Sequence, residues 1–152
     1  MNEESRNNIR VLLVDDEVDF METLVKRMKK RGLNVKGVKS GEEALAVLGE
    51  ETFQVVVLDV KMPGMNGIEV LKIIKKRHPR AEVIMLTGHA SLELAMQGME
   101  SGAYDYLMKP MDLDELIYKI EDAYESCLLR VRQAEVFGDV GREKTSSHKE
   151  TK

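Results

Sequence analysis

Cysteine and long apolar runs are both scarce in this chain of 152 residues. The single cysteine, Cys127, can form neither an internal disulfide nor a cysteine-ligated metal site, and its apolar neighbours at helical spacing indicate a core or interface residue. No apolar run approaches the roughly 20 residues that a membrane-spanning helix needs. The polar segment of residues 1–10 lacks the apolar stretch of a secretory signal. We therefore expect a cytoplasmic protein without a membrane segment.

An excess of positive charge is also missing. The chain carries 23 basic and 27 acidic residues, which give a formal net charge of -4. Sequence-independent binding to nucleic acid depends on neutralising phosphates with Lys and Arg, so this charge balance disfavours it. No helix-turn-helix pattern or other recognisable domain is expected after residue 130. We expect no direct nucleic-acid binding by this chain, which is either a single-domain protein or a fragment of a longer one.

Short apolar segments are what the chain does contain. Residues 11–14, 55–58 and 83–86 are continuous apolar runs, and residues 35–38 and 104–108 are weaker candidates. Apolar runs without alternation predict strands that are covered on both faces, as in a parallel sheet.

Helical periodicity fills the intervals between these strands. Apolar residues recur at intervals of three and four positions in five segments. These segments start at Val18, Ala44, Ile68, Leu92 and Leu113. Strand and helix thus alternate five times, which predicts right-handed crossovers onto a parallel sheet. We expect an α/β fold with a doubly wound, five-stranded parallel sheet, the flavodoxin-like (βα)5 arrangement with strand order 2-1-3-4-5.

Helix starts and domain boundaries complete this prediction. Ser40 with Glu43 has the pattern of a capping box, and Asp112 with Glu115 is placed to begin the last helix. We assign residues 1–8 to a disordered N-terminus and residues 9–129 to the folded domain. Residues 130–152 are expected to continue the last helix to about residue 136 and then to form a disordered tail or linker stub, because they contain few apolar residues.

Five polar residues fall where the predicted strands end. Asp15 and Asp16 follow the first strand, Asp59 the third, Thr87 the fourth and Lys109 the fifth. The carboxyl ends of parallel strands meet at one edge of the sheet, where such folds bind ligands. We therefore expect these five side chains to gather at one site.

The chemistry of this set favours a divalent cation and a phosphoryl group. Three carboxylates repel one another unless a cation is present, and oxygen-only ligation suits Mg²⁺. Asp16 and Asp59 are predicted to bind the ion directly and Asp15 through water. A carboxylate held in this way can attack a phosphoryl group and form an acyl phosphate. Lys109 and Thr87 would then stabilise the phosphoryl oxygens.

At these residues the chain resembles the receiver domains of bacterial two-component response regulators. The matching pieces are VDDE at 14–17, LD at 58–59, MPGMNG at 62–67, LTG at 86–88 and YLMKP at 106–110. They occur in the family's order and at similar spacings over roughly residues 9–129. The resemblance implies a switch that a sensor histidine kinase or phosphotransfer protein phosphorylates, and that controls a downstream protein target or effector domain.

The resemblance also implies a role for each site residue. Asp59 is similar to the phosphoacceptor, and Asp15 with Asp16 to the acidic pair that holds Mg²⁺ together with it. The main-chain carbonyl of Lys61 is similar to the remaining metal ligand from the protein. The family's phosphoacceptor domains catalyse only their own phosphorylation and dephosphorylation.

Thr87, Lys109 and Tyr106 are similar to the residues that convert phosphorylation into a conformational change. Thr87 and Lys109 would contact the phosphate, and Tyr106 would be the aromatic ring that turns inward. The resemblance implies a cis Lys109–Pro110 bond and a signalling face built from the fourth helix, the fifth strand and the fifth helix, with a phosphorylation-dependent homodimer as a further hypothesis. From the residues alone, one of the rings of Tyr104 and Tyr106 is expected to be buried and the other exposed.

Two histidines and one glycine-containing loop have less specific interpretations. His78 precedes Pro79 in a predicted loop and is interpreted as a surface residue. His89 follows Thr87 by two positions, and Lys61 follows Asp59 by two, so both lie at the rim of the predicted site, where they could tune the lifetime of the phosphate. The loop at residues 62–67 is not followed by Gly-Lys-Ser/Thr, which argues against a nucleotide-binding P-loop.

Three other functions stay open. A Mg²⁺-dependent phosphohydrolase also uses an Asp nucleophile, but its usual signature has a second Asp two positions later, where this chain has Lys61. A flavin-binding module of the same topology needs phosphate-binding loops rich in Ser and Thr, whereas the first strand here is followed by acidic residues 15–17. A receiver-like scaffold that is never phosphorylated would not require competent residues at all five positions.

Overall fold

A single parallel sheet forms the centre of the protein. The computed structural model describes residues 1–151, with the side chains of all of these except His89 and residues 137–151. The sheet has the order β2-β1-β3-β4-β5, and each neighbouring pair of strands is parallel. Its strands are β1 (Arg10–Val14), β2 (Asn34–Val38), β3 (Val55–Asp59), β4 (Glu82–Thr87) and β5 (Asp105–Met108). The predicted fold class, the number of strands and their order are therefore confirmed.

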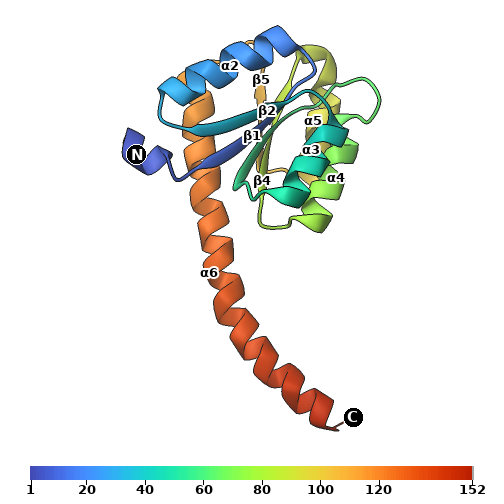
Figure 1. The fold of residues 1–152 in the computed structure, drawn as a ribbon. Coiled ribbons are helices and arrows are strands. Elements are labelled where there is room, and N and C mark those ends of the chain that lie inside the picture. The colour runs from blue at the N-terminus through green and yellow to red at the C-terminus, as the bar shows by residue number, and fades with distance from the viewer. Residues whose placement is uncertain (152) are drawn as a thin grey trace.

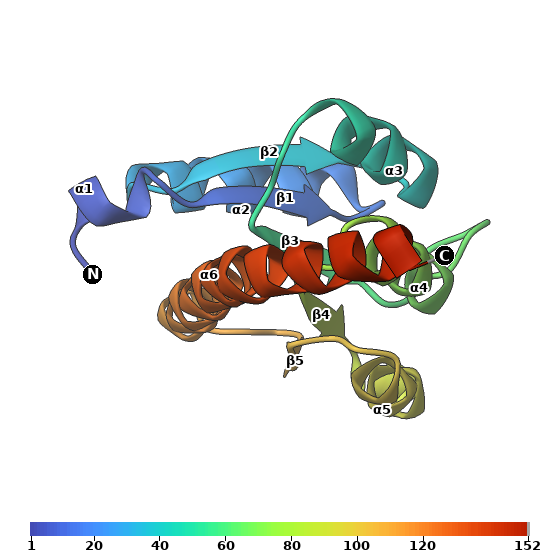
Figure 2. The ribbon, with the colours of Figure 1, turned by 90° about the horizontal axis from the view of Figure 1, so that it is seen from below.

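Helices cover both faces of this sheet, as Figures 1 and 2 show. The helices are α1 (Glu3–Arg6), α2 (Val18–Lys30), α3 (Gly41–Glu50), α4 (Gly67–Arg77), the short 3-10 helix η1 (His89–Ser91), α5 (Leu92–Glu100) and α6 (Leu113–Thr151). One hydrophobic cluster joins the sheet to α3, α4 and α5, and a second joins it to α2 and α6. Every residue of β3 and β4 is buried, because each of these strands has a helical layer on both sides.

Local hydrogen bonds begin the helices where the sequence predicts. The Ser40 hydroxyl accepts a bond from the Glu43 amide at 3.1 Å, and the Glu43 carboxylate accepts one from the Lys39 amide at 3.1 Å. Asp112 accepts a bond from the Asp114 amide at 3.0 Å at the start of α6. These side chains satisfy amides that have no partner within the first helical turn.

The two ends of the chain differ from the expectation of disorder. Residues 1–8 contain α1, and the Arg6 guanidinium ties it to the body by donating to the Arg31 carbonyl at 3.1 Å. The ammonium group of Met1 lies 3.3 Å from the Glu121 carboxylate on α6. At the other end, α6 does not stop near residue 136 but continues to Thr151. No proline follows Pro110, so no residue in this segment removes a helical backbone donor.

A buried carboxylate fixes α6 to the sheet at the edge opposite the predicted site. Glu82, at the start of β4, is only 1% exposed and accepts a hydrogen bond from the Ser126 hydroxyl at 2.7 Å. The Lys75 ammonium on α4 lies 3.4 Å from this carboxylate, and the Arg130 guanidinium lies 3.6 Å from it. Lys75 also donates to the carbonyls of Pro79 and Ala81. One carboxylate thus joins β4, α4 and α6.

We expect Glu82→Gln to lower the free energy of unfolding by roughly 3 kcal/mol, because the amide keeps the shape but leaves Lys75 and Arg130 without their anion. Urea denaturation followed by circular dichroism would measure this loss. Asp114→Asn is the matched control, since Asp114 pairs with Arg31 at the surface and such pairs contribute less than about 1 kcal/mol. Equal losses for the two variants would contradict the assigned role of Glu82.

Candidate metal centre

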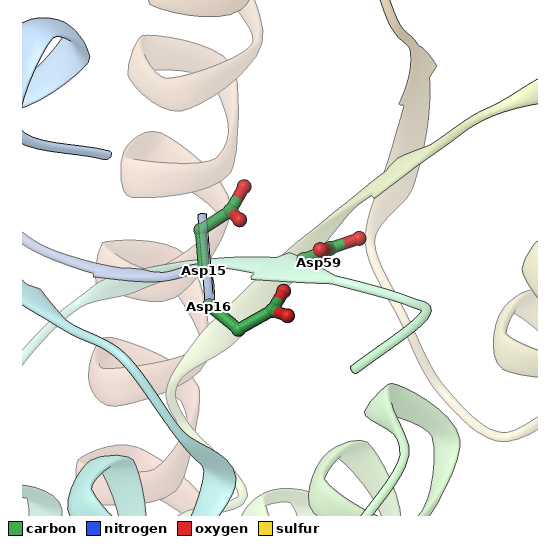
Figure 3. Close-up of side chains that lie close together, drawn as sticks. All are labelled: Asp15, Asp16 and Asp59. Atoms are coloured by element: carbon green, nitrogen blue, oxygen red, sulfur yellow. The ribbon is translucent and has the colours of Figure 1, made fainter. Parts of the chain in front are cut away.

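Three carboxylates meet at the carboxyl edge of the sheet. Asp15 and Asp16 directly follow β1, and Asp59 is the last residue of β3, the strand beside β1. Figure 3 shows the three side chains directed into the same region. One carboxylate oxygen from each residue lies within 4.8 Å of the others. The prediction that these residues converge at one strand edge is confirmed.

Backbone amides hold two of these carboxylates in place. One oxygen of Asp15 accepts a hydrogen bond from the Glu17 amide at 2.9 Å, and one oxygen of Asp59 accepts a bond from the Lys61 amide at 3.3 Å. Asp15 is fully buried and Asp59 is 7% exposed, whereas Asp16 is half-buried. The site is therefore enclosed on the side of the core and reached from the side of Asp16.

Lys109 supplies the positive charge of the site. Its ammonium group lies 2.9 Å from the Asp15 carboxylate, 3.8 Å from Asp59 and 4.0 Å from Glu17. The Lys109 amide donates to the Thr87 carbonyl at 2.7 Å, which holds the ends of β4 and β5 together. The peptide bond between Lys109 and Pro110 is cis, as the resemblance implies.

Thr87 lies at the site, but its hydroxyl points elsewhere. The residue ends β4 and is 1% exposed. Its hydroxyl donates to the carbonyl of the adjacent Gly88 at 3.1 Å. A hydrogen bond from Thr87 to a group on Asp59 therefore requires this hydroxyl to rotate.

The two tyrosines of the fifth strand segment differ from the expectation of one buried and one exposed ring. Both are half-buried. Tyr106 packs on the cluster beneath α3, α4 and α5, whereas Tyr104 precedes β5, packs on the opposite cluster and donates its hydroxyl to Asp122. The expectation fails because side chains two positions apart in a strand share a face, so strand alternation does not predict one buried and one exposed ring, and Tyr104 in addition lies before β5.

The electrostatics of the cluster favour a divalent cation. Burial raises the pKa of Asp59 from 3.8 to about 6, Lys109 counteracts this shift, and Asp15 adds to it. When all three carboxylates are ionised, they and Lys109 carry a combined charge of minus two. The donor set is made of oxygen alone, the type that Mg²⁺ prefers. The residues present thus fit this ion in both charge and ligand chemistry.

Phe20 also lies at this site, although no sequence motif points to it. Its ring on α2 lies under the Lys109 ammonium, with 4.5 Å from the nitrogen to the ring centroid. In the sequence, Phe20 is only an apolar residue at helical spacing of four from Leu24, in the first turn of the helix predicted from Val18. An isolated apolar residue at such spacing is most often part of the core, so the pattern alone gives no reason to select it.

His78 is not part of the carboxylate cluster. His78 is half-buried and lines a cavity of about 500 Å³ with Phe53, Pro79 and Arg80, at the edge of the sheet opposite the carboxylates. This cavity contains none of the predicted site residues. His89 belongs to η1, and its side chain lies outside the described part of the structure.

Within residues 1–151, no helix is long and apolar enough to cross a membrane.

Comparisons with known proteins agree with this geometry. The sequence model of the response regulator receiver domain family matches residues 11–121. The DNA-binding transcriptional regulator NtrC of Salmonella typhimurium is 40% identical over 113 residues, which are 74% of this chain and 24% of that protein. A putative NtrX-like response regulator of Rickettsia bellii is 37% identical over 124 residues, or 80% of this chain and 26% of that protein.

Solved structures give the same result for the fold. The crystal structure of the receiver domain of NtrX from Brucella abortus is 34% identical to this chain, with a TM-score of 0.72, and the match covers 76% of this chain and 98% of that one. The chain spans about a quarter of the length of the curated relatives that it matches.

Proposed function

The chain belongs to the response regulator receiver domain family, whose members are signalling regulators, and from that premise we propose that Asp59 is its phosphoacceptor. The supporting observation is that the nearly buried Asp59 lies beside two further carboxylates and one ammonium group, all at the carboxyl edge of the sheet. This grouping concentrates negative charge on a nucleophile and places a cation within reach of an incoming phosphate.

The proposed reaction is a phosphoryl transfer to Asp59. An oxygen of its carboxylate forms a bond to phosphorus, while the bond from phosphorus to a nitrogen of the donor's phosphohistidine breaks. The electron pair leaves with the imidazole. Lys109, 3.8 Å from Asp59, can then turn from Asp15 toward a phosphoryl oxygen and stabilise its charge. With a small donor such as acetyl phosphate, the leaving group is acetate instead.

Three carboxylates and one carbonyl would hold the metal ion. Asp16 and Asp59 would contribute side-chain oxygens directly, Asp15 would act through water, and Lys61 would contribute its main-chain carbonyl. Bound Mg²⁺ supplies positive charge that neutralises the phosphoryl oxygens. The Glu17 and Lys61 amides keep two of these carboxylates oriented whether or not an ion is present.

We further propose that Thr87 and Tyr106 transmit the change. A phosphoryl group on Asp59 would offer the Thr87 hydroxyl an acceptor stronger than the Gly88 carbonyl. Movement of Thr87 toward it would open space for the Tyr106 ring, which is now half-buried. The signal would reach partners through α5, β5 and α6.

The partners follow from the family. We propose that a sensor histidine kinase or phosphotransfer protein in the cytoplasm donates the phosphoryl group, and that a downstream protein or effector domain responds. The relatives carry receiver domains as about a quarter of their length, which supports an output on another segment or another chain. A phosphorylation-dependent homodimer stays a hypothesis that sedimentation with and without phosphoryl donor would test.

Intact-mass spectrometry after incubation with acetyl phosphate tests the proposed function. We expect the protein to gain one phosphoryl group in Mg²⁺ and none in chelator, and we expect Asp59→Asn to gain none under either condition. Asp105→Asn is the control, because Asp105 lies outside the carboxylate cluster and pairs with Lys119. A gain on Asp59→Asn, or steady hydrolysis of phosphate esters without a phosphorylated protein, would contradict the proposal and support a phosphohydrolase.

A further inference from the structure

The ammonium group of Lys109 has an aromatic neighbour as well as anionic ones. Its nitrogen lies 4.5 Å from the centroid of the Phe20 ring, within the range over which a cation is attracted to the face of a ring. The same nitrogen lies 2.9 Å from Asp15 and 3.8 Å from Asp59. The ring, the buried carboxylate and the acceptor carboxylate thus surround one cation.

We propose that Phe20 is a positioning residue for Lys109, which keeps its ammonium group within reach of Asp59 during phosphoryl transfer. This inference rests on the proposed function, because it assigns to Phe20 a part in the reaction of Asp59. Phe20 itself contacts no reacting atom and acts through Lys109.

The direction of each contact explains why a ring suits this task. The bond from Lys109 to Asp15 is directional and must weaken when the ammonium group turns toward a phosphoryl oxygen on Asp59. Attraction to the face of a ring depends much less on direction, so the contact with Phe20 persists through that turn. A further carboxylate, Glu17, lies 4.0 Å from the ammonium group and is 68% exposed. Without the ring, Glu17 and water would compete for Lys109 and draw it out of the site.

Packing holds the ring where it is. Phe20 is half-buried and packs against the hydrophobic cluster shared by α2, α6 and the sheet. It also lines a small cavity of about 140 Å³ with Leu24, Pro110, Met111 and Leu113. Because Pro110 directly follows Lys109, the ring shares this cavity with the segment that carries the side chain that it positions. The Lys109 side chain is only 21% exposed, and the attraction between a cation and a ring is stronger where contact with water is reduced.

Kinetics of phosphorylation by acetyl phosphate in Mg²⁺ test this role. We expect Phe20→Leu, which keeps the apolar bulk but not the ring, to lower the rate constant at saturating donor about fivefold, the effect of one such contact. The half-saturating concentration of donor should change little, because Phe20 contacts Lys109 and not the donor. Phe20→Tyr retains a ring and should keep a rate close to that of the unsubstituted protein.

The chain offers a matched control at the other edge of the sheet. The Arg10 guanidinium lies 4.7 Å from the centroid of the Phe53 ring, so Phe53→Leu removes a similar contact far from Asp59. We expect Phe53→Leu to leave the rate constant unchanged below its unfolding temperature. An unchanged rate in Phe20→Leu, or equal losses in Phe20→Leu and Phe53→Leu, would overturn the positioning role.

A double-mutant cycle separates this inference from the proposed function. Unfolding of Phe20→Leu, Lys109→Met and the double variant, each without metal, measures whether the two side chains interact. We expect a coupling of about fivefold in the unfolding equilibrium constant. Additive effects would overturn the contact even if Asp59 is phosphorylated. Coupling in a protein that acetyl phosphate does not modify would instead overturn the function proposed for Asp59.

Discussion

Asp59→Asn is expected to stabilise the protein at neutral pH when no divalent cation is present. The pKa of Asp59 rises from 3.8 to about 6 in the folded protein, chiefly because the carboxylate is buried. Above pH 6 the folded state must hold this charge, whereas the unfolded chain exposes it to water. A shift of this size corresponds to about 3 kcal/mol. The neutral amide of Asn avoids this cost, so the variant should unfold at higher denaturant concentration.

The pH dependence of this difference has a defined sign. A carboxyl group whose pKa is raised in the folded state is favourable to folding while it is protonated, and this contribution is lost as the pH rises through about 6. The advantage of Asp59→Asn should therefore be largest above pH 6 and should disappear near pH 4. Urea unfolding in chelator between pH 4 and pH 8 would measure it. An advantage that does not vary with pH would contradict the buried charge as its cause.

Lys109→Met is expected to slow phosphorylation of Asp59 about 100-fold or more, because it removes the one cationic side chain found beside the carboxylates in the described structure. Metal-free protein should also lose stability, since Asp15 is fully buried and Lys109 is its ion-pair partner. The pKa of Asp59 should rise above about 6, because Lys109 is the main group that lowers it.

The phosphorylation rate of Lys109→Met would be measured by intact mass, and its Mg²⁺ affinity by titration. Mg²⁺ should bind Lys109→Met more tightly than the unsubstituted protein, because one positive charge has left the site. Lys36→Met is the control. Lys36 lies on β2, which is on the side of β1 away from β3, and it pairs with Glu51, so its substitution should not affect the rate. Normal phosphorylation of Lys109→Met would show that Lys109 does not stabilise the transferred group.

The sheet and the carboxylate cluster were predictable from the sequence for one physical reason. A parallel strand buried on both faces has to be apolar throughout, so a polar residue marks its end. Asp59 and Thr87 end β3 and β4, and Asp15 follows β1 directly. Because parallel strands end at the same edge, Lys109 could be placed beside Asp15 even though 94 positions separate them.

Features that depend on packing between helices were not predictable in this way. In the sequence, Phe20 looks like an ordinary core residue and Glu82 like an ordinary charged residue at the end of a strand. Only the fold brings Lys109 to Phe20 and Ser126 to Glu82. Lys119 on α6 is likewise half-buried, because it pairs with Asp105 on β5. Such partners lie on elements that are far apart in the sequence, so no local pattern specifies them.

The long α6 turns a small rotation into a larger displacement. Glu82 holds the helix at Ser126 and Arg130, and residues 131–151 extend beyond this anchor for about 30 Å. A tilt of about 5° at the anchor would move the far end by roughly 2.5 Å over this length. The helix begins at Leu113, four positions after Lys109, so its two ends lie on opposite sides of the anchor at Glu82. A shift too small to rearrange the sheet would thus become a distance that another protein surface can detect.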